Sequence, residues 1–206
     1  MKRFIALITL CLFVFVADAA PPAPEPVNLS EQAEFATRSC IVNYYESQAA
    51  LSIIEQTNRN DHQAINDYFE FIGLHRLNNP GTSYLARAYC GAFLANAWLR
   101  CMPSVPFVKS NARLASVDGW RYDGKAALTT KEKAEKGDVV AFRAYRHVEG
   151  IIDRHPNPTF PYFTVVGANT SAPKELKEKR GGVYKKTRLW RDIGWVVSVE
   201  KTLQLI

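Results

Sequence analysis

A cysteine and a histidine are the residues of this sequence best suited to nucleophilic chemistry. Cys90 stands at the predicted start of an amphipathic helix, and His147 lies in a later, strand-like region. The dipole and unpaired N–H groups of a helix N-terminus stabilise a thiolate, the nucleophilic form of cysteine, and can hold an oxyanion. Gly91 would let a substrate approach the backbone beside the thiol. The pair therefore predicts a cysteine nucleophile with a histidine base.

Each of these residues also has a purely structural interpretation. Cys90 lies on the apolar face of its helix, and free cysteines are often simply buried. Cysteine catalysis further needs a third group that orients the histidine. Asn169, Asp153 and Glu149 are the polar candidates, and the last two would share a face with His147 on a regular strand.

Other chemistries find less support in the sequence. The histidines and cysteines show no zinc-type pairing, and neither a CxxC nor an HExxH motif is present. There is no GxSxG motif and no phosphate-binding loop. Basic and aromatic residues near Arg143 are too few to indicate RNA binding. We therefore expect no metal, no cofactor and no nucleic-acid partner.

The elements that would position Cys90 and His147 follow the order helices first, strands second. Apolar residues at helical spacing predict helices that begin near Asn28, near Asp61 and at Cys90, with a short helix over 111–117. Strand signals dominate afterwards, over residues 139–145, 147–153, 162–166 and 194–200. This order predicts an α+β domain with an antiparallel sheet.

Residues 1–27 are typical of export and tethering segments. Residues 1–19 combine a basic start, an apolar run and a small-x-small site, as in a secretory signal peptide. The apolar run is shorter than the ~20 residues that span a bilayer, although an uncleaved anchor stays open. Residues 20–27 are a proline-rich tether, and residues 28–206 would form one domain. We expect an exported protein, periplasmic or extracellular, with no membrane span after cleavage.

The cysteines that remain after cleavage constrain the disulfide pairing. A continuous helix would separate Cys90 from Cys101 by about 16 Å, which is too far for a bridge. A bridge from Cys40 to Cys101 is the pairing that leaves Cys90 free.

The chain is mildly basic, with a formal net charge of +6. Such a charge suits an anionic polymer, whether cell wall or nucleic acid. The late basic residues alternate with Glu175 and Glu178, so we interpret residues 174–191 mainly as a solvated charged face.

Short segments, in order along the chain, carry a family resemblance. They are residues 89–94 (YCGAFL), 137–142 (GDVVAF), 146–148 (RHV), 167–171 (GANTS), and 182–183 (GV) with the closing 195–199 (WVVSV). Together they resemble the CHAP-type amidases, relatives of the NlpC-type papain-like peptidases. The resemblance implies a papain-like fold, with Cys90 attacking an amide or peptide bond of peptidoglycan through an acyl-enzyme and without a metal.

Three departures from the family pattern concern the surroundings of His147. Arg146 replaces the usual glycine, and Glu149 intrudes before Gly150. Gly167 stands where many relatives carry the acidic third residue, so the orienting role falls to Asn169 by default. A Cys–His–Asn set is chemically sound, because a neutral amide can fix an imidazole.

Two other functions are compatible with the same residues. One is a non-catalytic papain-like domain that binds cell-wall peptides, which a buried Cys90 far from His147 would favour. The other is a papain-fold acyl transferase, which would use the same nucleophile and base.

Overall fold

The computed structural model describes residues 29–56, 62–74, 89–102, 104–107, 110–142, 147–155, 161–173, 176 and 180–206. The predicted signal peptide and tether, residues 1–19 and 20–27, lie outside the described residues. No helix within the described ranges is both long and apolar enough to cross a membrane.

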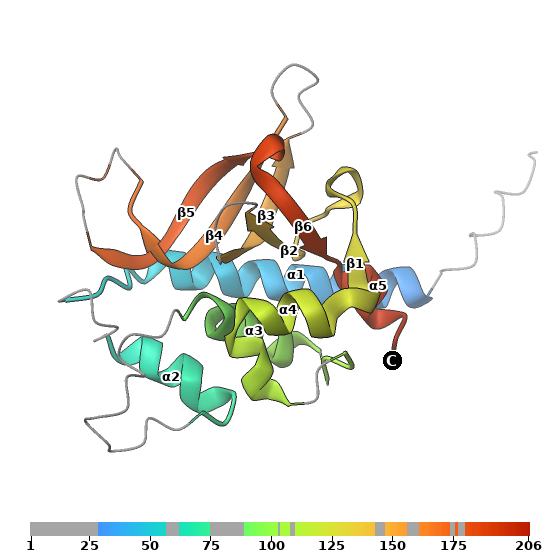
Figure 1. Cartoon of the computed structure of the whole chain (residues 1–206), viewed down its shortest axis with the longest axis horizontal. Helices are drawn as coiled ribbons and strands as arrows, with labels where there is room; N and C mark the ends of the chain where they lie inside the picture. The colour runs from blue at the N-terminus through green and yellow to red at the C-terminus, as the bar shows by residue number, and fades with distance from the viewer. Residues whose placement is uncertain are drawn as a thin grey trace, which may run out of the picture.

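The described chain is an α+β arrangement, as the sequence predicts (Figure 1). The α-helices are α1 (Leu29–Ala50), α2 (Gln63–Phe71), α3 (Cys90–Cys101), α4 (Val117–Tyr122) and α5 (Val199–Leu203). Short 3₁₀ helices are η2 (Asn111–Ala115), η3 (Asp123–Ala127), η4 (Lys131–Lys133) and η6 (Trp190–Asp192). The strands are β1 (Leu128–Thr129), β2 (Val139–Phe142), β3 (Val148–His155), β4 (Tyr162–Ser171), β5 (Gly181–Leu189) and β6 (Ile193–Val197).

These strands form one antiparallel sheet in the order β1-β6-β2-β3-β4-β5. Helices α1 to α4 lie along one side of it in Figure 1. The face toward the helices carries Val139, Val148 and Val166, whereas Val140 and Phe163 belong to a separate apolar cluster. Both faces of the sheet are therefore covered, which explains why several strands have nearly continuous apolar sequences.

The predicted elements are largely present, with shifted boundaries. Helix α3 spans Cys90–Cys101 as expected, whereas α2 begins at Gln63 rather than near Asp61, which lies outside the described residues. His62 caps α2, since its Nδ1 accepts a hydrogen bond from the Ala64 N–H at 3.2 Å. Strand β5 was not among the predicted strands, because its sequence is charged.

Helix α3 is the most enclosed helix of the structure. Each residue from Cys90 to Trp98 is buried, and several are alanines. A side chain at Gly91 would begin 2.5 Å from the carbonyl oxygens of Leu114 and Ala115 in η2. The glycine therefore lets the backbone of η2 approach α3, and η2 fills space that the sequence interpretation left for a substrate.

The Cys40–Cys101 disulfide ties α1 to the C-terminal end of α3, with Cα atoms 5.7 Å apart. The predicted pairing is confirmed. Cys90 is the free cysteine of the described residues.

The carboxylate of Asp138 joins three segments beneath the sheet. It is fully buried and accepts a hydrogen bond from Arg38 of α1 at 2.6 Å. It also accepts from the backbone N–H groups of Val199, the first residue of α5, and of Glu135, both at 2.9 Å. Gly137 precedes it with φ of +89°, a conformation that favours glycine. The Gly137-Asp138 pair is thus a structural junction.

We predict that Asp138→Ala lowers the free energy of unfolding by about 3–5 kcal/mol, because it leaves the guanidinium of Arg38 without its buried partner. Urea denaturation measures the change. Glu34→Ala is the matched control, since Glu34 also bonds Arg38 at 2.6 Å but its side chain is 28% exposed. The control should cost less than about 1 kcal/mol. Equal losses in the two variants would contradict the junction role of Asp138.

Candidate active site

Cys90 is the first residue of α3, and its thiol lies near the imidazole of His147. The N-cap residue, Tyr89, makes no side-chain hydrogen bond to the helix. The thiol therefore sits at the positive end of a helix dipole with no competing side-chain cap. Cys90 is only 1% exposed, and it lies close enough to His147 to help raise the pKa of that imidazole. The two residues that the sequence singled out are thus brought together across a long sequence separation.

His147 precedes β3 and contacts Cys90 on one side and Glu149 on the other. Its Nε2 lies 3.2 Å from Oε1 of Glu149, so Nδ1 is the ring nitrogen left for the thiol. The ring of Phe142 stacks on the imidazole with centroids 6.4 Å apart. The imidazole is therefore held by an acceptor at one edge and an aromatic ring on its face.

The carboxylate of Glu149 is fully buried and is shared between His147 and Arg188. Arg188 of β5 donates two hydrogen bonds to it, from Nε at 2.9 Å and from Nη2 at 2.6 Å. The guanidinium in turn lies over the ring of Phe142, 4.8 Å from its centroid. A paired charge of this kind offsets the large cost of removing a carboxylate from water.

Gly167 of β4 makes the space that Glu149 occupies. A Cβ atom on Gly167 would lie 2.6 Å from Oε1 of Glu149 and 2.9 Å from its Cδ. Any larger residue at this position would displace the carboxylate from His147.

These contacts set the charges of the site. Burial lowers the pKa of His147, but the hydrogen bonds and charges of Cys90 and Glu149 outweigh it and raise that pKa to about 9. Burial raises the pKa of Glu149, yet Arg188 and His147 outweigh burial and lower that pKa to about 2. At neutral pH the imidazole is therefore protonated and the carboxylate is ionised.

The two shifts act on stability in opposite pH ranges. The raised pKa of His147 stabilises the fold fully below the ordinary value of 6.5, and this contribution is lost as the pH rises through about 9. The lowered pKa of Glu149 stabilises the fold above the ordinary value of 4.5, and this contribution is lost as the pH falls toward about 2.

Asn169, the predicted orienting residue, lies in a bulge of β4. The register with β5 shifts between Ala168 and Thr170, and Asn169 has φ of +56°. Asparagine tolerates this left-handed conformation better than most residues. Among the hydrogen bonds of the described residues, none joins the Asn169 side chain to His147. Its orienting role stays a prediction, and the observed contact to His147 is made by Glu149.

Asp153, the other candidate, is placed away from His147 by a second bulge. The pairing of β3 with β4 shifts between Ile151 and Asp153, so the alternation assumed for a regular strand fails. Asp153 instead contacts Lys136 at 3.3 Å and His155 at 2.9 Å.

Arg188 is the residue of this site that the sequence interpretation missed. It was grouped with the solvated charges of residues 174–191. Residues 185–188 are all polar and lack the alternation of apolar and polar residues that marks a strand, so the role of Arg188 became visible only with Glu149 as its buried partner.

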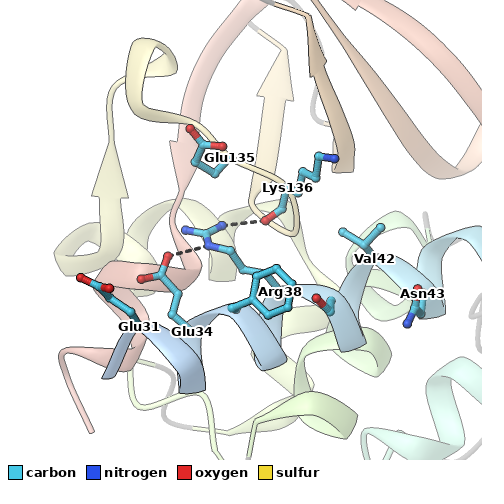
Figure 2. A pocket seen from close by; sticks show the side chains of 9 residues that line it. Glu31, Glu34, Arg38, Val42, Asn43, Glu135 and Lys136 are labelled. Atoms are coloured by element: carbon cyan, nitrogen blue, oxygen red, sulfur yellow. Dashed lines mark hydrogen bonds and ion pairs between the residues drawn. The ribbon is translucent and has the colours of Figure 1, made fainter. Parts of the chain in front are cut away.

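A groove lies elsewhere, between α1 and the turn before β2 (Figure 2). It has a volume of about 590 Å³ and is lined by residues of α1 from Glu31 to Asn43, together with Glu135 and Lys136. Figure 2 shows Arg38 in its wall, bonded to Glu34 and to the carbonyl oxygen of Lys136. This groove is separate from the Cys90 site.

The described residues contain no group of three or more histidine, cysteine or acidic side chains that could hold a metal ion. No protein-family model, no curated protein and no solved structure matches the chain. The candidate site is therefore defined by its own residues and their geometry.

We predict that Glu149→Gln lowers the pKa of His147 by about one unit or more, because the variant removes an anion from the imidazole while the burial remains. NMR titration of the His147 ring protons measures the shift without any need for a substrate. Asp153→Asn is the control, since it removes an equal charge next to His155. An unchanged titration of His147 in Glu149→Gln would contradict the assignment.

Proposed function

We propose that this chain is an exported cysteine amidase or endopeptidase of papain-like arrangement, which hydrolyses an amide or peptide bond of peptidoglycan. The observation that carries the proposal is the placement of His147 between Cys90, at the N-terminus of α3, and Glu149, whose Oε1 lies 3.2 Å from the His147 Nε2. A nucleophile, a base and an orienting group in contact form the general arrangement of nucleophilic catalysis.

The proposed reaction uses these side chains in two steps. The Cys90 thiolate attacks the carbonyl carbon, and N–H groups at the start of α3 stabilise the oxyanion. The C–N bond then breaks as the His147 imidazolium gives its proton to the leaving amine. Water, deprotonated by the neutral imidazole, next attacks the thioester carbonyl; the C–S bond then breaks, which releases the acid and restores the thiolate–imidazolium pair. Glu149 keeps the imidazole oriented throughout.

Two departures from the family pattern support the role of Glu149 when they are taken together. Gly167 lacks the acidic side chain that many relatives of the resembled family carry, and Glu149 adds one. The carboxylate of Glu149 occupies the space directly beside Gly167. We therefore propose that the orienting carboxylate comes from β3 here, in place of the family's position on β4.

The substrate class rests on the sequence. The resemblance to CHAP-type amidases and the predicted signal peptide both favour a target outside the cytoplasm. The positive net charge favours an anionic polymer.

The burial of Cys90 favours a second candidate, a non-catalytic domain that binds wall peptides. At 1% exposure the thiol is enclosed, and acylation would need the surrounding residues to move. Its contact with His147 argues for catalysis instead. An acyl transferase would share the first step and differ in the acceptor of the acyl group.

We predict that the protein from Ala20 onward releases fragments from purified peptidoglycan, and that Cys90→Ala abolishes the release because it removes the nucleophile. Mass spectrometry of the products identifies the bond that is cut. The double variant Cys40→Ala/Cys101→Ala is the control, because it removes the cysteines of the disulfide and keeps Cys90. Binding without release by the intact protein would favour the second candidate, and activity that survives in Cys90→Ala would contradict the first.

We predict that Asn169→Gly keeps most of the turnover, because Glu149 already orients His147 and glycine accepts the positive φ of this bulge. Asn169→Ala should keep turnover as well but lose about 1 kcal/mol of stability, because alanine is strained in the left-handed region. Initial rates and thermal unfolding separate the two effects. A loss of orders of magnitude in Asn169→Gly would restore Asn169 as the orienting residue.

A further inference from the structure

Lys186 of β5 is a half-buried cation near Glu149 and Arg188 of the candidate site. Its ammonium Nζ donates a hydrogen bond to Oγ1 of Thr170 at 2.9 Å and lies 3.5 Å from Oγ of Ser171. Both hydroxyls follow the bulge of β4. Among the ion pairs of the described residues, none involves Lys186, although it lies near Arg188 and Glu149.

The charges around Lys186 leave it uncompensated. Glu149 is already engaged by Arg188 and by His147. The adjacent Lys185, on the other side of the strand, has its own partner in Glu46 at 3.5 Å. Burial lowers the pKa of Lys186 further than Glu149 raises it, and Arg188 lowers it too. A partly desolvated cation without a counter-charge is the electrostatic signature of a binding position for an anion.

The two hydroxyls complete a set of donors. Because the oxygen of Thr170 accepts from the ammonium, its own proton is free to donate to a ligand, and the same holds for Ser171. One cation and two hydroxyl donors match the single charge and the two oxygens of a carboxylate. A doubly charged phosphate would call for further cations.

We propose that Lys186, Thr170 and Ser171 form a subsite that binds a free carboxylate of the peptide substrate beside the scissile bond. This inference rests on the proposed function, since peptide stems of peptidoglycan carry such carboxylates. It makes the enzyme selective for stems whose carboxylate is free over stems in which it is amidated.

The test measures binding in a protein that cannot turn over. Cys90→Ala is titrated by calorimetry with the C-terminally amidated peptide L-Ala-γ-D-Glu-L-Lys-D-Ala-NH2, whose one carboxylate is the glutamyl group, and with the same peptide carrying a glutamyl carboxamide. We expect the free carboxylate to bind about tenfold tighter or more, the effect of a charge-assisted hydrogen bond.

Variants of Lys186 and Lys185 in the Cys90→Ala protein show which lysine causes the preference for the free carboxylate. Lys186→Met should bind both peptides equally, and Lys186→Arg should keep the preference because it keeps the charge. Lys185→Met is the matched control for net charge and should behave like its parent. Thermal unfolding confirms that each variant folds.

Equal affinity for the two peptides, binding of neither, or a preference that survives Lys186→Met would overturn the subsite. The proposed hydrolase function is tested separately, by the release of peptidoglycan fragments by the protein that keeps Cys90. The failure of one proposal is therefore distinguishable from the failure of the other.

Discussion

The enclosure of helix α3 is the constraint on which the rest of the structure depends. Its first nine residues are buried, so every neighbouring element must come close to it. Small residues such as Gly91 allow η2 to approach at backbone distance, and the Cys40–Cys101 disulfide holds the other end against α1. A helix fixed at both ends presents Cys90 to the start of β3 in one position. The geometry of the site is thus a consequence of core packing.

The buried charge of Glu149 is the second requirement, and it organises the strands around the site. A lone carboxylate in this position would be strongly unfavourable, so Arg188 from β5 and His147 must both reach it. Gly167 supplies the necessary space on β4. Residues of three strands therefore surround one carboxylate, and among the ion pairs of the described residues none involves Lys186 on β5.

Local sequence patterns predicted the helices and most strands well, because their apolar residues follow the period of the element. Helix α3 was predicted from Cys90 to Cys101, and its length excluded a bridge between these two residues, whereas the Cys40–Cys101 bridge was expected because it leaves Cys90 free. Strand β5 was missed because Lys186 and Arg188 resemble surface charges until a buried partner is known. The bulges in β3 and β4 were missed as well, since an extra residue in a strand has no apolar period of its own.

The sequence by itself determined which residues could react: a cysteine at a helix start, a later histidine, and three polar candidates for the third role. Residue types and helical spacing are local properties, and they suffice for that much. Only the tertiary structure showed which of Asn169, Asp153 and Glu149 contacts His147, and that residue is Glu149. The strand bulges carry Asp153 away, the missing side chain of Gly167 admits Glu149, and Arg188 neutralises it. Each of these effects depends on which residues meet across the sheet, and register is a long-range property that no single segment encodes.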